Sequence, residues 1–367
     1  MDPDLLLAGL QAGQTAALAR AISVVENRRP GFERLLADVH RSLGRARRIG
    51  ITGPPGAGKS TLVERLVAAY RQAGFRVAVV AVDPTSPFTG GALLGDRIRM
   101  ESVALDQGVY IRSMGSRGSL GGLATTTREV CDLLDAAGFD RILVETVGVG
   151  QSELDVARMA DVTVLVLVPE SGDGIQTLKS GVMEVADLFV VNKADRPGAE
   201  KLRQEIEVTL GFRRGNAFRH VRAHHGRSVA GKPASAGVTL SEAKGASPKA
   251  WPLRSSQDDS SHGDSAWVPP VFTTVAAKGE GVAELIAALD RHHVWLTESG
   301  TLAERRRRRL LDRTREVVDR ATRRWVWEET LADRRIAERM DEIVAGSVSP
   351  YDVAAEVLDS LKQGERI

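Results

Sequence analysis

The chain has 367 residues, which is enough for one large domain with appended helices. Its 50 Lys and Arg nearly balance its 48 Asp and Glu, and the net charge of +2 excludes a global attraction to nucleic acid or to an anionic membrane. A single cysteine, Cys131, excludes an internal disulfide framework and a thiolate metal cluster, so we expect a reducing, cytoplasmic location.

The N-terminal part predicts helices. Residues 1–46 carry apolar side chains at helical spacing, with a break at Arg29-Pro30-Gly31. The first residues hold acids where a signal peptide needs a basic flank, and no apolar run approaches the roughly 20 residues of a membrane span. We therefore predict an N-terminal helical extension, with neither a signal peptide nor a membrane partner.

Residues 47–297 have the pattern of an α/β domain. Short runs rich in β-branched residues alternate with helical segments, which is typical of a parallel sheet covered by helices on both faces. A polar stretch at 213–266 interrupts this alternation, and we interpret it as a flexible insertion. The predicted strands are 49–52, 77–82, 141–145, 162–168, 188–192 and 270–275.

The C-terminal part is helical again. From residue 281 onward we predict two or three amphipathic helices, with breaks at 298–300 and 347–350, so that residues 298–367 form a helical arm. The five arginines at 305–309 raise the alternative of nucleic-acid binding. They point around the helix rather than along one groove, and nearby acids dilute their charge, so a dimer arm or a partner-facing helix fits better.

A glycine-rich segment after the first predicted strand fits the phosphate-binding pattern G-x-x-x-x-G-K-[ST] and precedes a predicted helix. Glycines let successive backbone amides turn toward phosphate oxygens, and the helix N-terminus adds its positive end. We expect Lys59 to reach the β- and γ-phosphates, Ser60 to bind Mg²⁺ and Thr61 to lie near the α-phosphate. The predicted loop consists of Gly53, Pro54, Pro55, Gly56, Ala57, Gly58, Lys59, Ser60 and Thr61.

A second motif, N-K-A-D at 192–195, follows a predicted strand and fits the N-K-x-D pattern of guanine-specific proteins. Its aspartate can accept hydrogen bonds from the ring N–H and the exocyclic amine of guanine, which adenine lacks, so we predict GTP rather than ATP. The lysine is expected to stack along the base, and the asparagine to tie this loop to the phosphate loop. A third loop after the strand at 270–275 is placed to reach the guanine oxygen with backbone amides. The predicted base-binding residues are Asn192, Lys193, Asp195, Val275, Ala276 and Ala277.

Acids at two predicted strand ends, Asp83 and Glu145, are candidates for orienting Mg²⁺ or its water shell. Glu145 opens E-T-V-G, which resembles the D-x-x-G element with Glu in place of Asp, so the Gly148 amide could bond the γ-phosphate. Two polar, glycine-containing segments, 85–99 and 169–180, suit switch loops that the nucleotide orders. In the first, Asp96 and Arg99 could instead open a solvated helix; in the second, Lys179 could face the nucleotide or a partner.

Six segments in this order resemble the MeaB/ArgK family, P-loop GTPases of the SIMIBI class: GPPGAGKST, AVDPTSP, GDRIRM, VETVGVGQSE, VPESGDGIQ and NKAD. The resemblance covers about residues 15–212 and 268–365. It implies a chaperone of an adenosylcobalamin-dependent acyl-CoA mutase, with methylmalonyl-CoA mutase as the first candidate. GTP hydrolysis would gate cobalamin delivery and exchange of damaged cofactor, and the C-terminal helical arms would join a homodimer.

By matching position, the resemblance also implies a Mg²⁺ shell and three switch regions, at 83–99, 146–154 and 169–180. The family's label as an arginine/ornithine transport kinase finds no support, because no second substrate site or membrane partner is evident. Intrinsic hydrolysis should be slow, since no residue is an obvious water-activating base. The implied metal shell is Ser60, Asp83, Asp96 and Glu145, and the predicted catalytic residues are Lys59, Asp83, Asp96, Arg99, Glu145, Gly148 and Lys179.

Two other functions of the same class remain open. GTPases that insert nickel or zinc use Cys/His ligand sets, which Cys131 alone cannot build. The adjacent pairs His224-His225 and His292-His293 point apart on a strand or helix, and we expect them to be solvated. Protein-targeting GTPases normally carry D-T-A-G and T-K-x-D, whereas this chain has E-T-V-G and N-K-A-D.

Overall fold

The computed structural model describes residues 3–83, 103, 105–115, 122–146, 152–169, 182–213, 266–330 and 332–362. The chain divides into two compact units, Met1–Ser299 and Gly300–Ile367, and each is described by itself. The predicted insertion at 213–266 lies almost wholly outside the described residues. Within them, no helix is both long and apolar enough to cross a membrane.

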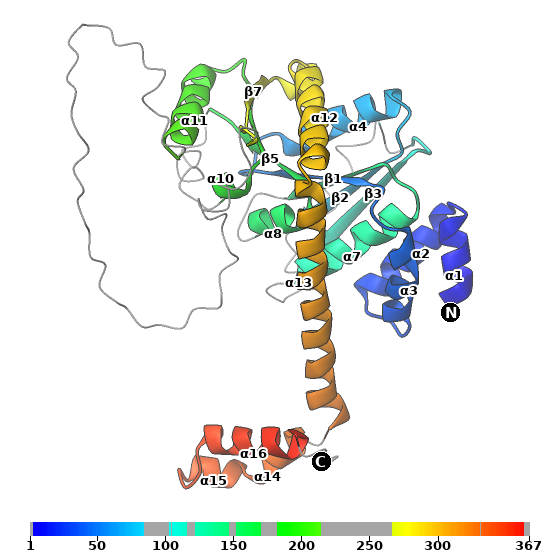
Figure 1. Cartoon of the computed structure of the whole chain (residues 1–367), viewed down its shortest axis with the longest axis vertical. Coiled ribbons are helices and arrows are strands. Elements are labelled where there is room, and N and C mark those ends of the chain that lie inside the picture. Colours follow the sequence, from blue (N-terminus) through cyan, green and yellow to red (C-terminus); the bar gives the residue numbers. More distant parts are fainter. Residues whose placement is uncertain are drawn as a thin grey trace, which may run out of the picture. The chain divides into compact units, whose positions relative to one another are not determined.

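A seven-stranded sheet forms the centre of the first unit (Figure 1). Its order is β3-β2-β4-β1-β5-β6-β7, and every neighbouring pair is parallel. The predicted α/β fold with a mostly parallel central sheet is therefore confirmed. The strands are β1 (Arg47–Thr52), β2 (Val77–Asp83), β3 (Val109–Gly115), β4 (Arg141–Thr146), β5 (Val162–Leu167), β6 (Leu188–Asn192) and β7 (Val271–Thr274).

Helices cover both faces of this sheet (Figure 1). Their bounds are α1 (Pro3–Gln11), α2 (Thr15–Glu26), α3 (Phe32–Val39), α4 (Lys59–Gln72), α7 (Gly122–Ala136), α8 (Ser152–Met159), α10 (Val182–Val185), α11 (Ala199–Arg213) and α12 (Val282–Glu298), with 3₁₀ turns η1 (His40–Ser42) and η3 (Ala276–Lys278). Strand alternation sends successive side chains to opposite faces. In β2, Val77 and Val79 join the apolar cluster under α4 and α12, whereas Ala78 and Val80 join the cluster that α7 and the N-terminal helices share.

The prediction omitted the edge strand β3. Its sequence, VYIRSMG, has a single buried side chain, Met114, so it lacks the continuous apolar run that marks the central strands. Arg112 in the middle of β3 is only partly exposed because it forms an ion pair with Glu26 of α2. The N-terminal helices thus supply the charge that lets an arginine sit in this strand.

Aspartates fix the amino ends of several strands. Each aspartate stands directly before a strand and forms two hydrogen bonds with one residue at or near the start of a neighbouring strand. The aspartate carboxylate accepts a hydrogen bond from the backbone N–H of that residue. The backbone N–H of the aspartate donates to the carbonyl oxygen of the same residue. The pairs are Asp140 with Arg76, Asp161 with Arg48, and Asp187 with Thr163, with carboxylate distances of 2.7, 3.1 and 3.0 Å.

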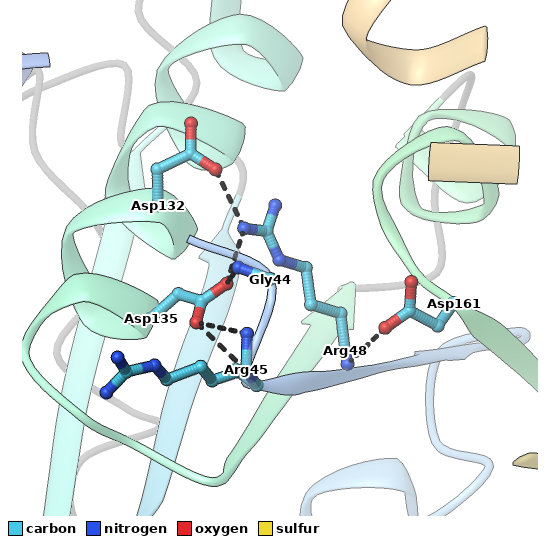
Figure 2. A network of polar contacts seen from close by, with 7 residues as sticks. Gly44, Arg45, Arg48, Asp132, Asp135 and Asp161 are labelled. Carbon is cyan, nitrogen blue, oxygen red and sulfur yellow. Dashed lines mark hydrogen bonds and ion pairs between the residues drawn. The ribbon is translucent and has the colours of Figure 1, made fainter. Parts of the chain in front are cut away.

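A buried network of charges anchors the start of β1 (Figure 2). Asp135, only 1% exposed, accepts hydrogen bonds from the backbone amides of residues 44, 45 and 46 at 2.8, 3.1 and 3.0 Å. The Arg48 guanidinium lies 2.7 Å from Asp132 and 3.5 Å from Asp135. Since β1 leads directly into the glycine-rich loop, this network fixes the strand from which that loop starts.

One expectation about histidines is wrong. His292 of α12 is fully buried, not solvated, and its ring lies against Trp267 and Trp295 at centroid distances of 4.6 and 5.7 Å. Trp267 donates its indole N–H to the carbonyl oxygen of Asp187 at 2.8 Å. Trp295 is three residues from His292 on the same helix, whereas Trp267 comes from before β7. Their rings bury His292, which the adjacent pair His292-His293 in the sequence did not indicate.

The second unit is helical. It consists of α13 (Thr301–Arg324), a π-helical turn (Trp325–Glu329), α14 (Ala332–Glu338), α15 (Met340–Val344) and α16 (Pro350–Lys362). Helix α13 buries none of its residues within the described chain, and Leu310, Leu311 and Val318 on it are exposed. Helices α14 and α16 are joined by hydrogen bonds of 2.7 Å from Arg335 to Ser360 and of 3.0 Å from Arg339, beside α14, to Glu356.

Candidate functional site

The candidate site lies at the carboxyl ends of the central strands, where ligands of open parallel sheets bind. The loop after β1, the end of β4, the loop after β6 and the turn after β7 meet there, because these strands share one direction in the sheet. Three segments that the sequence predicts as nucleotide-binding, at 53–61, 192–195 and 275–277, are thereby joined through hydrogen bonds.

The glycine-rich loop has the backbone that its motif requires. Gly53 has a φ of 137°, and a Cβ there would stand 2.0 Å from the Val166 carbonyl oxygen. Gly58, with a φ of 83°, directly precedes α4, and a Cβ on it would lie 2.4 Å from the Asn192 amide nitrogen. Both positions therefore need glycine for conformation and for space. Helix α4 begins at Lys59, directly after Gly58.

Lys59 lies inside this loop. Its side chain is buried, and Nζ donates to the carbonyl oxygens of Gly53 and Pro54 at 2.8 and 2.9 Å. The ammonium group is thus held beside the N-terminus of α4, where the helix dipole also favours negative charge. A buried cation next to a helix N-terminus suits a phosphate group.

Ser60 and Glu145, which the sequence predicts as Mg²⁺ ligands, lie side by side in the candidate site. The Ser60 hydroxyl donates to Glu145 Oε1 at 2.6 Å, and the Glu145 side chain, at the end of β4, is buried. A hydroxyl and a carboxylate oxygen side by side are ligands that Mg²⁺ prefers, so these residues fit that ion. Asp83 ends β2, the strand next to β4, which puts its backbone at the same edge of the sheet.

Asn192 connects the three loops. It is buried at the end of β6, and its amide nitrogen donates to the carbonyl oxygen of Ala57 in the phosphate loop at 2.8 Å. Its amide oxygen accepts hydrogen bonds from the Thr274 hydroxyl at 3.0 Å and from the Ala276 N–H at 3.1 Å. One side chain therefore sets the position of the turn after β7 relative to the phosphate loop.

The predicted base-reading acid, Asp195, is partly exposed. The Asp195 side chain is 45% exposed, and a carboxylate oxygen lies 3.9 Å from Lys278 Nζ. Lys193 adopts a left-handed backbone with a φ of 56°, a conformation that non-glycine residues seldom adopt. The Ala194 N–H donates to the Thr274 carbonyl oxygen at 3.0 Å, which fixes the loop that carries Asp195.

Four of the predicted catalytic residues, Asp96, Arg99, Gly148 and Lys179, lie outside the described residues. They belong to the three segments that resemble switch regions.

Comparison with known proteins shows the family to which the chain belongs. Residues 18–330 match the family described as methylmalonyl-CoA mutase-associated GTPase MeaB. A protein of Pyrococcus horikoshii that is assigned as a GTPase is 39% identical over 362 residues, which cover 98% of this chain and 99% of the relative. The chain belongs to the MeaB family of GTPases. Hydrolysis of GTP is therefore its reaction, as the two motifs predicted.

Two further relatives of this MeaB-family chain match about half of it. GTPase ArgK of Escherichia coli is 46% identical over 190 residues, covering 51% of this chain and 57% of ArgK. The methylmalonic aciduria type A homolog of Mus musculus is 44% identical over 206 residues, covering 52% of this chain and 50% of that protein. A crystal structure named LAO/AO transport system kinase aligns with 98% of this chain and 97% of its own, with a TM-score of 0.60 and 25% identity.

The structure adds residues that the motifs did not predict. Arg65 of α4 donates to the carbonyl oxygens of Ala276 and Ala277 at 3.1 and 2.6 Å. Lys278 approaches Asp195, and Thr274 supports Asn192. Lys278 adjoins the predicted 275–277 turn, so extending that turn by one residue would have found it. Arg65 carries no such signal, since an arginine on a helix surface is commonly solvated.

Proposed function

We propose that this MeaB-family GTPase is a chaperone of an adenosylcobalamin-dependent acyl-CoA mutase, with methylmalonyl-CoA mutase as the first candidate. It binds and hydrolyses GTP to gate delivery of the cobalamin cofactor and to protect or reactivate the mutase. The observation that carries the proposal is the guanine-type site in a chain whose family is described as mutase-associated. The name of the murine relative, methylmalonic aciduria type A homolog, is consistent with such a partner.

In this proposal the phosphate loop holds GTP by its charge and its amides. The backbone amides of residues 53–61 surround the phosphates, Lys59 contacts the β- and γ-phosphates, and Thr61 lies near the α-phosphate. Asp195 accepts hydrogen bonds from the guanine edge, and Lys193 stacks along the base. The 2.8 Å bond from Asn192 to Ala57 supports a fixed separation between the base and phosphate ends.

Ser60, Asp83, Asp96 and Glu145 would hold Mg²⁺, which when bound supplies positive charge beside the phosphate oxygens. The contact between Ser60 and Glu145 supports this assignment for two of the four residues. Gly148 would bond the γ-phosphate through its amide and so make the segment around it sensitive to hydrolysis. Arg99 and Lys179 are the candidates for stabilising charge during hydrolysis once a loop closes, so intrinsic turnover is slow and a partner accelerates it.

We further propose that the protein is a homodimer joined through the arm at 298–367. The exposed apolar residues of α13 are consistent with this role, because a helix that buries none of its own side chains within the described chain has an apolar surface left to cover.

The nucleotide assignment is tested by calorimetric titration of the full chain with GTP, XTP and ATP. Asp195→Asn should move the preference from GTP toward XTP, because an amide group presents a donor to the O2 of xanthine. Lys59→Ala should abolish binding of all three nucleotides. An Asp195→Asn variant that still prefers GTP would show that another residue reads the base.

The partner assignment is tested by affinity capture with purified mutase. The tagged chain, loaded with a non-hydrolysable GTP analogue, should retain methylmalonyl-CoA mutase on a column, and Lys59→Ala serves as the control that cannot load nucleotide. If neither the loaded nor the unloaded chain retains that mutase, or isobutyryl- and ethylmalonyl-CoA mutase in parallel columns, the mutase proposal is wrong.

A further inference from the structure

The turn after β7 has a single free amide in the described structure. The N–H of Val275 donates to the Glu280 carbonyl oxygen at 3.1 Å, and that of Ala276 donates to Asn192. Those of Lys278 and Gly279 donate within the turn, at 2.9 and 3.1 Å. Among the amides of residues 275–279, only that of Ala277 is therefore available to a ligand.

Arg65 bonds the same peptide group that carries this amide. The Ala276 carbonyl and the Ala277 N–H belong to one peptide unit, and Arg65 Nε donates to that carbonyl oxygen at 3.1 Å. In a trans peptide the C=O and N–H bonds point in opposite directions. Holding the carbonyl toward α4 thus directs the Ala277 N–H away from α4. A second bond of 2.6 Å, from Arg65 Nη2 to the Ala277 carbonyl oxygen, fixes the next peptide unit as well.

The guanidinium also changes the donor strength of this peptide unit. A charged donor on a carbonyl oxygen polarises the peptide, and hydrogen bonds in such a chain strengthen one another by about 10–30% each. The Ala277 N–H should therefore be a better donor with Arg65 in place than without it.

The position of Arg65 makes this contact stable. Arg65 is in the second turn of α4, while Leu62 and Leu66 of the same helix are fully buried in the apolar cluster that also contains Ala276. Helix α4 and the turn after β7 thus pack into one apolar cluster, and Arg65 joins them by hydrogen bonds at the surface. Gly281, whose Cβ would stand 2.2 Å from the Thr273 carbonyl oxygen, lets the chain close behind the turn.

From these contacts we infer that Arg65 is a positioning residue for guanine recognition: it orients and polarises the Ala277 amide, which donates to the O6 atom of guanine. This inference rests on the proposed GTP site. It adds recognition of guanine O6, an atom that Asp195 does not contact. Arg65 itself does not touch the nucleotide.

The test compares GTP with 6-thio-GTP, in which a sulfur atom, a weaker hydrogen-bond acceptor, replaces O6. Affinities are measured by calorimetry on the full chain. Loss of one such hydrogen bond should weaken GTP binding by about three- to tenfold in Arg65→Ala. The affinity of Arg65→Ala for 6-thio-GTP should differ from that of the wild type by less than about twofold. The ratio of GTP affinity to 6-thio-GTP affinity should therefore approach one in this variant. Arg65→Lys, which can still donate to a carbonyl, should restore part of the ratio.

Two controls separate this role from a merely structural one. Arg71→Ala removes another arginine of α4, one that pairs with Asp106 at 2.9 Å, and should leave the GTP to 6-thio-GTP ratio at its wild-type value. ITP lacks the exocyclic amine but keeps O6, so Arg65→Ala should weaken ITP and GTP by the same factor. An Arg65→Ala protein that loses affinity for GTP and 6-thio-GTP equally would overturn the inference while leaving the GTP site intact. A wild-type chain that binds ATP as tightly as GTP would overturn both.

Discussion

Replacement of Asn192 by alanine is the sharpest test of how the site is built. Its carboxamide makes hydrogen bonds to Ala57, Thr274 and Ala276 at 2.8, 3.0 and 3.1 Å, and its side chain is buried. At about 1 kcal/mol for each lost bond, Asn192→Ala should lower the free energy of unfolding by about 3 kcal/mol. Because the turn after β7 also loses its link to the phosphate loop, GTP affinity should fall by at least about tenfold.

Two measurements are combined. Urea unfolding, monitored by circular dichroism, gives the free energy of unfolding. GTP titration without urea, at a temperature where the variant is folded, gives the affinity. Thr274→Val is the matched control, since it removes one of the three bonds and keeps the contact between Asn192 and Ala57. It should lose about 1 kcal/mol and bind GTP within about threefold of wild type. If Asn192→Ala has the same free energy of unfolding and the same GTP affinity as Thr274→Val, Asn192 does not connect the two ends of the site.

Three further predictions concern stability. Asp135→Asn should lower the free energy of unfolding by about 2 to 4 kcal/mol in urea titrations, because the buried carboxylate accepts three backbone amides beside Arg48; a loss below about 1 kcal/mol would contradict this. Burial raises the pKa of Tyr70 to about 12 from 10.0, so the unfolded chain ionises this phenol at a lower pH than the folded chain. The free energy of unfolding should therefore fall by about 1.4 kcal/mol per pH unit between those two values. Tyr70→Phe should lack this part of the pH dependence, and an equal pH dependence in the variant would contradict the prediction. Ser349 holds the pKa of Asp352 below its usual 3.8 through its hydroxyl and its backbone N–H, so the start of α16 should keep its cap above that pH and lose it as the pH falls through the lowered pKa; amide exchange there, corrected for intrinsic rates, should show this dependence more weakly in Ser349→Ala, which keeps only the backbone bond, and an equal dependence would contradict this.

Much of the sheet followed from local sequence because the central strands are buried on both faces and read as continuous apolar runs. All six predicted strands are present, and β1 begins two residues before its predicted start, at Arg47. Strand β3 was missed because an edge strand needs fewer apolar residues and because Arg112 depends on Glu26, 86 residues away. The aspartates that precede β4, β5 and β6 are a signal for strand starts that the sequence did contain, in G-F-D-R, M-A-D-V and V-A-D-L.

Sequence motifs predict roles for residues whose chemistry is local, such as Lys59 and Asp195. They could not predict Arg65, whose acceptors lie 211 and 212 residues along the chain and are backbone carbonyls with no identity of their own. Nor could they indicate which amide of the turn after β7 remains available, because that depends on which carbonyls and side chains the other amides bond in three dimensions.

The central proposal, a GTPase whose switch serves a cobalamin-dependent mutase, is tested most directly by single-turnover hydrolysis of GTP by the full chain with and without methylmalonyl-CoA mutase. We predict a slow intrinsic rate and an acceleration of at least about tenfold with the mutase present, because a partner must close the loops that carry the charged residues onto the γ-phosphate. Equal rates at saturating mutase would contradict the proposal.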